Sequence, residues 1–264
     1  MKIPFTKAHG AKNDFLLTWE ADAPEEGRRE AARALCDRHT GVGADGWIVV
    51  APAGDAEAEG SIRLYNSDGG TAEISGNGTR CAAGFLVRNG LAAGVVRVRT
   101  GAGIKTLRLL ERSGRAFVFE MDMGRPEIAA ARFFLPLGGG PLDVTLIGMG
   151  NPQCAVPVTT FDFDWRGLGA EIESHPHFPN RTNVSFVRAT GEHAIDVRFW
   201  ERGAGETMSS GTGSAGAAVA AVTRGMAKSP VSVQTPGGTL NLRWDTNIYL
   251  TGPAEIVAEG QFFL

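Results

Sequence analysis

Two short glycine-rich segments contain the residues best suited to chemistry. They are Ser75-Gly-Asn-Gly and Ser210-Gly-Thr-Gly, and each precedes an alanine-rich stretch of good helix formers. Free N–H groups and the positive dipole end favour bound anions at the start of a helix. Two such sites suit a reaction with mirror-related faces, in which one group removes a Cα proton and another returns a proton from the opposite side. The segments therefore predict racemisation or epimerisation of an amino-acid-like carboxylate.

The two segments are part of a longer internal repeat with a constant offset of 135 residues. The aligned pairs include Arg63 with Arg198, Tyr65 with Trp200, Ser75-Gly76 with Ser210-Gly211, and Gly90 with Gly225. A looser match joins GAKN at 10–13 to GMGN at 148–151. A unit of this length has the size of a domain and is much longer than a solenoid repeat. We therefore predict two related halves, with the ligand in a cleft where both helix starts point.

Each copy of the repeat predicts the same local structure. A β-like run, at 61–66 and at 195–201, precedes the glycine-rich turn. A helical stretch, at 79–89 and at 214–224, follows the turn and stops at a glycine suited to a left-handed C-cap. Both helices are almost free of charged residues, so we expect both to be buried.

The whole pattern predicts an α/β (α+β) fold with two pseudo-symmetric halves, each a curved sheet or barrel around one central apolar helix. The N-terminal half is expected at 1–114, completed by 256–264, where the apolar GQFFL returns as an edge strand. The C-terminal half is expected at 115–255. An amphipathic helix is predicted at 24–38, and alternating strands at 95–100, 105–111 and 115–123.

Composition narrows the class of protein. The chain has 264 residues, a formal net charge of −3, 43% hydrophobic residues and 21% charged residues, a globular composition without the basic excess that binds nucleic acid. No apolar run approaches the ~20 residues of a membrane-spanning helix, and the starting MKIPFTKAHG lacks the apolar core of a secretory signal. We expect a cytoplasmic protein with a small-molecule amino-acid substrate and no nucleic-acid or membrane partner.

Motifs for cofactors and metals are missing from the sequence. It contains no phosphate-binding GxxxxGK[ST], no HExxH and no Cys/His cluster with metal-ligand spacing. Cys36, Cys81 and Cys154 are an odd number without paired spacing, so we expect neither a disulfide framework nor a structural zinc site. No lysine has a convincing Schiff-base context. We therefore predict a reaction that uses no cofactor and no metal.

Six ordered blocks resemble the diaminopimelate epimerase family, which interconverts L,L- and meso-diaminopimelate without a cofactor. The blocks are GAKNDF (10–15), RHTGVGADG (38–46), NSDGGTAEISGNGTRCAA (66–83), GNPQ (150–153), PNRTNV (179–184) and ERGAGETMSSGTG (201–213). Proline racemases and phenazine-type isomerases, relatives on the same fold, fit less well. The resemblance implies lysine and peptidoglycan precursor synthesis in the bacterial cytoplasm, by an enzyme of a kind that is commonly a homodimer.

The resemblance implies a role for most of the site. The substrate-binding asparagines are Asn13, Asn66, Asn151 and Asn183. Glu201 and Arg202 grip the distant ammonium and carboxylate of the substrate, since guanidinium suits carboxylate and Glu pairs with ammonium. The reacting carboxylate is held by the N–H groups of Gly76, Asn77, Gly211 and Thr212. Without the resemblance, each asparagine would be interpreted as a turn residue, because Asn favours turn positions.

The chain departs from the family at the two proton-transfer positions. These are cysteines in the family, and Ser75 and Ser210 occupy them here. A thiol has a pKa of ~8.5, which a helix start lowers, whereas a hydroxyl is several units less acidic. A gap of about four units corresponds to roughly a 10⁴-fold loss of rate. An adjacent base rescues a serine, but no histidine is near either one in the sequence.

Two further site positions differ from the family. Gln153 replaces the usual His beside GNP, and Gly46 replaces a common Gln. We expect Gln153 and Glu201 to modulate the acid–base pair and Gly46 to lie at the substrate. Cys81 and Cys154 are poor substitutes for the missing thiols. Cys81 is inside the predicted apolar helix, where a cysteine is ordinarily a buried structural thiol. Cys154 follows Gln153 closely enough to be near the site, but we do not expect it to be catalytic.

Three explanations of the serine pair stay open at this point. The serines were introduced deliberately to trap the substrate, or the chain is a natural variant that still epimerises. The third is a natural paralogue that acts on another amino acid, runs another reaction such as dehydration, or binds without catalysis. Cα proton exchange separates an enzyme from a binding protein.

Overall fold

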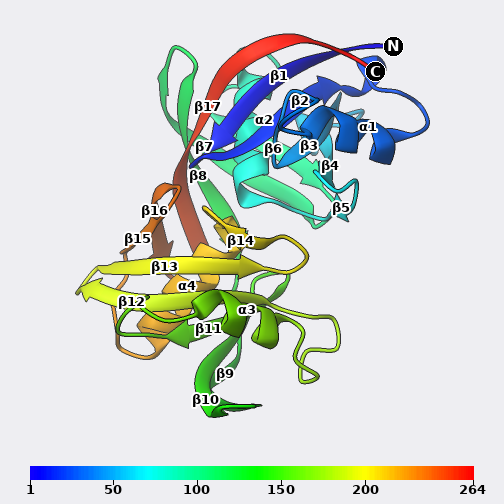
Figure 1. Ribbon diagram of the computed structural model, residues 1–264. Helices are drawn as coiled ribbons and strands as arrows, with labels where there is room; N and C mark the ends of the chain where they lie inside the picture. Colours follow the sequence, from blue (N-terminus) through cyan, green and yellow to red (C-terminus); the bar gives the residue numbers. More distant parts are fainter. The chain divides into compact units, whose positions relative to one another are not determined.

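The computed structural model describes residues 1–264, which form two compact units (Figure 1). Unit 1 consists of Met1–Met121 and Gly252–Leu264, and unit 2 is Asp122–Thr251. No helix in either unit combines the length and the apolar character that a bilayer crossing requires.

Unit 1 is a closed ring of paired strands around helix α2 (Gly76–Arg88). The ring runs through β1 (Lys2–Gly10), β2 (Asn13–Trp19), β3 (Gly46–Pro52), β4 (Gly60–Asn66), β6 (Val95–Thr100), β7 (Gly103–Ser113), β8 (Ala116–Gly124) and β17 (Ile248–Phe263), which pairs with β1 again. The short β5 (Thr71–Ala72) adds to β4, and η1 is Glu20–Asp22. Every α2 residue from Gly76 to Val87 is buried, as the sequence predicted.

Helix α1 (Arg28–Cys36) gives unit 1 a second apolar layer. Its buried residues pack with Trp47 and Val49 of β3. Ile48 of the same strand approaches α2, since a Cβ added at Gly78 would lie 3.1 Å from its Cδ1. Successive residues of a strand point to opposite faces, so β3 is covered on both sides. This explains its continuous apolar run.

Unit 2 repeats the order and sense of the strand pairings in unit 1. Its strands are β9 (Glu127–Leu137), β10 (Gly140–Gly148), β11 (Pro152–Pro157), β12 (Asn183–Gly191), β13 (Ala194–Glu201), β14 (Gly205–Thr207), β15 (Val231–Thr235), β16 (Gly238–Trp244) and the start of β17. The parallel pairs β2–β3 and β4–β6 of unit 1 have counterparts in β11–β12 and β13–β15. Helix α4 (Gly211–Thr223) packs against these strands and is buried from Gly211 to Ala221, as predicted. Helix α3 (Trp165–Glu173) contributes to a separate apolar cluster.

Both central helices begin three residues earlier than the sequence predicted. Helix α2 starts at Gly76 rather than 79, and α4 at Gly211 rather than 214. The glycines in these turns have poor helix propensity, but the serine cap and burial inside the unit outweigh that preference.

Helix α1 differs from expectation, whereas the C-terminal segment returns to β1. Helix α1 covers less than 24–38, because Gly27 immediately before it has a left-handed φ of 69°. The C-terminal segment does pair with β1, with Phe263 opposite Lys2. β17 as a whole pairs with β8 as well as with β1, and the Ile256 N–H, ahead of GQFFL, donates to the Arg115 carbonyl at 3.0 Å.

Candidate active site

The start of α2 is capped by Ser75. This residue has an extended backbone, with φ −131° and ψ 123°, and its Oγ accepts a hydrogen bond of 3.1 Å from the Gly78 N–H. The Gly76 N–H precedes the first intrahelical donor, so the helix itself offers it no acceptor. The cap therefore fixes Ser75 at the edge of a turn with a donor suited to an anion.

Ser210 caps α4 with nearly the same geometry. Its φ is −134° and its ψ 126°, and its Oγ accepts from the Gly213 N–H at 3.1 Å. The repeat in the sequence thus produces two equivalent serine-capped helix starts, one in each unit.

The two serines differ in their second contact. Ser210 Oγ donates to Glu201 Oε2 at 3.1 Å, and Thr207 Oγ1 donates to the other carboxylate oxygen at 2.5 Å. Glu201 ends β13, and the antiparallel β14 returns Thr207 beside it. A carboxylate can accept a hydroxyl proton. The sequence placed Glu201 among the modulating residues but did not predict its direct hydrogen bond to Ser210, although a strand–turn–strand from 195 to 207 could have indicated it.

Asn66 and Gly46 face each other across β3 and β4. Asn66 corresponds to Glu201 in the repeat and is exposed. A Cβ at Gly46 would lie 2.8 Å from the Tyr65 carbonyl oxygen. The backbone of this chain thus excludes a larger residue at position 46, and Gly46 has only backbone groups to offer a ligand.

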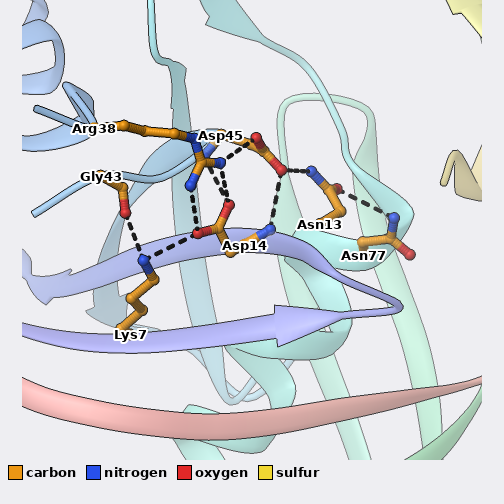
Figure 2. A network of polar contacts seen from close by, with 7 residues as sticks. All are labelled: Lys7, Asn13, Asp14, Arg38, Gly43, Asp45 and Asn77. Atoms are coloured by element: carbon orange, nitrogen blue, oxygen red, sulfur yellow. Dashed lines mark hydrogen bonds and ion pairs between the residues drawn. The ribbon is translucent and has the colours of Figure 1, made fainter. Parts of the chain in front are cut away.

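Asn13 reaches the α2 start from the tip of the β1–β2 hairpin. Asn77 Nδ2 donates to Asn13 Oδ1 at 3.1 Å, and Asn13 Nδ2 donates to Asp45 Oδ2 at 2.7 Å. Figure 2 shows this chain of two amides ending on a carboxylate. Asn77 is only 1% exposed. The structure thus brings Asn13 and Asn77 together beside the α2 turn.

Charged groups support that chain from behind (Figure 2). Arg38 Nη2 donates to Asp14 at 2.7 Å and to Asp45 at 2.8 Å, and Lys7 Nζ lies 3.1 Å from Asp14. Burial by itself raises the pKa of the Asp14 carboxyl, but the bonds from Arg38 and Lys7 outweigh burial and hold that pKa below its usual value. The Asp14 carboxylate therefore stays ionised, and its contacts with Arg38 and Lys7 anchor the hairpin tip.

The hairpin that carries Asn13 contains backbone strain. Ala11 and Lys12 join Gly10 to Asn13, and both have left-handed φ values, 52° and 63°. A type I′ turn requires such values and favours Asn-Gly, so these residues hold an unfavourable conformation next to a site residue.

We expect Lys12→Gly to raise the free energy of unfolding by about 1 kcal/mol, because glycine removes the left-handed penalty. Denaturant titration measures this change. Lys12→Ala removes the same side chain but keeps a Cβ, so it serves as the control and should give no gain. Equal gains from both substitutions would mean that the turn is not strained.

Asn151 and Gln153 occupy the corresponding place in unit 2. Asn151 Nδ2 donates to Thr212 Oγ1 at 3.3 Å, and Gln153 Nε2 donates to Asn151 Oδ1 at 2.8 Å and to Thr212 Oγ1 at 3.3 Å. Thr212 corresponds to Asn77 in the repeat. Gln153 is 3% exposed, and its Oε1 has no hydrogen-bond partner. Gln153 thus contacts two predicted binding residues, and no hydrogen bond joins it to Ser210.

Asn183 and Arg202 form a second group in unit 2. The Arg202 N–H donates to Asn183 Oδ1 at 3.0 Å, and Asn183 Nδ2 donates to the Pro152 carbonyl at 3.1 Å. Arg202 Nη1 donates to the Asn180 carbonyl at 3.0 Å, and the residue is exposed. The asparagine therefore positions the backbone that carries Arg202 and, one residue earlier, Glu201.

Glu173 is a buried carboxylate that the sequence did not single out. It is 5% exposed and accepts from Trp200 Nε1 at 3.0 Å and from the Gly203 N–H at 2.8 Å, while Arg181 Nη2 lies 2.7 Å away. Glu173 thus fixes both sides of the turn that contains Glu201 and Arg202. Nothing in the sequence distinguishes it from Glu171, the other acid of α3, because its partners lie on distant segments.

Glu173→Gln is expected to lower the free energy of unfolding by about 1.5–3 kcal/mol, since an amide cannot accept from all three donors. It should also weaken substrate binding by loosening the 201–203 turn. Denaturant titration and calorimetry check the two effects. The matched control is Glu171→Gln, the same substitution at an exposed position of the same helix, which should change little. Similar effects at both positions would contradict the proposed role.

The buried cysteines are unsuited to proton transfer at neutral pH. All three are free thiols. Burial raises the pKa of Cys81 and that of Cys154 to about 12, so both remain protonated. No group of three or more His, Cys, Asp and Glu side chains is arranged to hold a metal ion.

Comparison with known sequences gives matches over nearly the whole chain. The family model described as "Diaminopimelate epimerase" matches residues 5–129 and 145–257. A diaminopimelate epimerase of Halothermothrix orenii is 36% identical over 288 residues, covering 100% of this chain and 99% of that protein. Proteins of the same name are 39% identical in Pelotomaculum thermopropionicum, with 98% of both chains covered, and 40% identical in Microcystis aeruginosa, with 98% of this chain and 99% of that protein covered.

Solved structures match the fold at low sequence identity. A hydroxyproline epimerase from Agrobacterium vitis with bound trans-4-hydroxy-L-proline has a TM-score of 0.76 at 17% identity, covering 98% of this chain and 92% of that chain. A PhzF-family phenazine biosynthesis protein of Bacillus anthracis has a TM-score of 0.73 at 16% identity over 100% of both chains. At these identities the likeness shows a shared fold alone.

Proposed function

Because this chain belongs to the diaminopimelate epimerase family, and is therefore an isomerase of the epimerase class, we propose that it interconverts L,L- and meso-diaminopimelate. In this proposal Ser75 and Ser210 exchange protons with opposite faces of the substrate Cα, without a cofactor. The meso product would supply lysine and peptidoglycan precursors in the bacterial cytoplasm.

One observation carries the proposal: two helix starts have the same cap geometry, and each cap is a side chain that can exchange a proton. Ser75 and Ser210 agree within a few degrees in φ and ψ, and each accepts from the N–H three residues on at 3.1 Å. Epimerisation needs an acid and a base of similar strength that exchange roles when the reaction reverses. Duplicated helix starts supply such a pair, and their N–H groups suit the charge that develops on the reacting carboxylate.

The proposed proton path begins at the pair with a carboxylate. Ser210 gives its hydroxyl proton to Glu201 Oε2 while Ser210 Oγ takes the proton from Cα. The electron pair left on Cα spreads into the substrate carboxylate, where helix N–H groups stabilise it. Ser75 then gives its hydroxyl proton to the opposite face of Cα. Exchange with water removes the proton from Glu201 and restores the one lost from Ser75.

Proton transfer by this path is expected to be slower than proton transfer by a pair of thiols. A glutamate carboxylate has an ordinary pKa of about 4.3, so it is a weak base for a hydroxyl. We propose that the serine form acts as a weak epimerase whose binding residues retain the geometry for diaminopimelate. Three separate hydrogen bonds support this reading: Asn77 to Asn13, Asn151 to Thr212, and the Arg202 N–H to Asn183.

The test is Cα proton exchange in D₂O. The chain is incubated with L,L-diaminopimelate, the loss of the Cα proton signal is followed by NMR, and binding is measured separately by calorimetry. Exchange at Cα together with formation of the meso isomer is the expected result. Binding without exchange would make the chain a binding protein on this fold, and neither binding nor exchange would overturn the diaminopimelate assignment.

A further inference from the structure

Arg80 is a buried cation without a counter-ion. It lies in the first turns of α2, is 0% exposed, and donates only to neutral oxygens. Those acceptors are Asn77 Oδ1, the Gly76 carbonyl at 3.2 Å and the Pro253 carbonyl at 3.1 Å. Burial lowers the pKa of Arg80 to about 10, which still leaves it protonated at neutral pH. A buried charge is costly unless another charge pairs with it.

The guanidinium is enclosed closely at the helix start. A Cβ added at Gly10 would lie 3.3 Å from Arg80 Nη2, 3.2 Å from Asn77 Cβ and 3.2 Å from the Pro253 oxygen. Gly10 therefore permits β1 to approach, and three segments of unit 1 surround the charge. No acidic side chain forms an ion pair with it, in contrast to Arg224, whose side chain is 8% exposed and bonds Asp143 through both Nη1 and Nη2.

Arg80 also sets the direction of the amides at this site. An arginine only donates and an ionised Asp only accepts. Since Arg80 donates to the Asn77 oxygen, the Asn77 amide nitrogen is left to donate to Asn13, and the Asn13 amide nitrogen donates to Asp45 (Figure 2). A charge at each end of this chain thus excludes the flipped orientation of both asparagines.

The corresponding helix start in unit 2 has the opposite charge pattern. In the repeat, Arg80 aligns with Ala215 and Asn66 aligns with Glu201. The α2 start therefore has the buried cation Arg80 where the α4 start has a neutral alanine. Conversely, the α4 start has the carboxylate of Glu201 where the α2 start has a neutral asparagine. Two turns with equivalent backbones thus differ in charge: Arg80 makes no ion pair at the α2 start, whereas the Glu201 carboxylate accepts from Ser210 at the α4 start.

We propose that Arg80 is a positioning residue whose missing counter-ion is the substrate carboxylate. Its charge makes the α2 start the stronger of the two carboxylate sites, and its bond to Asn77 keeps the two asparagine amides in one orientation. This inference rests on the proposed function for the identity of the ligand, because diaminopimelate supplies the carboxylate.

Calorimetry with L,L-diaminopimelate tests the charge. Arg80→Met removes the charge and keeps most of the side-chain length, so it should weaken binding by about tenfold to a hundredfold. Arg80→Lys keeps the charge and should recover most of that loss. The matched control is Arg224→Met, which removes a largely covered arginine side chain with its own carboxylate and should lower stability without changing affinity. Unchanged binding in Arg80→Met, or equal weakening in Arg224→Met, would overturn the proposal.

A ligand-free measurement separates this inference from the proposed function. Asn77→Asp gives Arg80 a carboxylate, so its effect on the melting temperature should be more favourable in the parent than in the Arg80→Met background. Equal effects in the two backgrounds would show that Arg80 is not an unbalanced cation. If the parent fails to bind diaminopimelate, the proposed function is wrong, and this double-mutant cycle still decides the state of Arg80.

Discussion

Replacing both Ser75 and Ser210 by cysteine is expected to raise the rate of Cα proton exchange by about 10⁴-fold. The helix starts already provide the geometry, since each serine Oγ accepts from the N–H three residues on. A helix start stabilises a thiolate, and a difference of about four pKa units between thiol and hydroxyl corresponds to this factor. NMR in D₂O with L,L-diaminopimelate measures the rate for the parent and for the double variant.

Two controls define that result. Cys81→Ser and Cys154→Ser in the double-cysteine background should leave exchange unchanged, because both native thiols are buried and protonated. A double-cysteine variant that folds and binds diaminopimelate but exchanges no proton would show that the pocket has moved to another reaction. Full activity of the parent, equal to that of the double variant, would instead show that the serine pair is activated beyond what the Glu201 contact provides.

Glu201→Gln is expected to reduce exchange by the parent about 10²- to 10⁴-fold, the range for loss of a general base. The Glu201 carboxylate accepts from Ser210 Oγ at 3.1 Å, and an amide oxygen at the same place is far less basic. The rate at saturating substrate has to be compared, since Glu201 is also a proposed partner of the substrate's distant ammonium. Calorimetry on the same variant gives the binding loss separately.

Thr207→Val is the matched control for Glu201→Gln. It removes the 2.5 Å bond to the other carboxylate oxygen but leaves the base in place. Its rate should fall much less than that of Glu201→Gln. If the two variants lose the same activity, the hydrogen-bonded arrangement matters rather than the basicity of Glu201, and Ser210 would need another proton acceptor.

The sequence predicted those features that depend on local chain chemistry. The repeated Ser-Gly-x-Gly segments and the helices after them, which have few charged residues, can be recognised in the sequence, and the structure places both serines at N-caps. The first three helical residues were missed because glycine propensity indicates a turn, while burial and capping decide the outcome.

Contacts between segments that are distant in the chain could not be predicted from the sequence. Glu201 meets Ser210 because β14 pairs back on β13. Arg80 has no acidic partner, and the residues that enclose it, Gly10 and Pro253, are far apart in the chain. Glu173 is distinguished from Glu171 of the same helix only by donors on residues 181, 200 and 203. Each depends on strand register and loop return, which residue types and spacing do not determine.

The path of β17 has a consequence for folding during synthesis. Residues 252–264 complete the ring of unit 1, yet all of unit 2 precedes them in the chain. During synthesis the first 121 residues therefore leave the ribosome long before residues 252–264 are made. Until then, one side of β1 has no strand partner. The Pro253 carbonyl that accepts from Arg80 also arrives only at this stage. Such late, long-range closure slows folding and exposes an unpaired strand meanwhile, so the guanidinium pocket is among the last parts of the molecule to form.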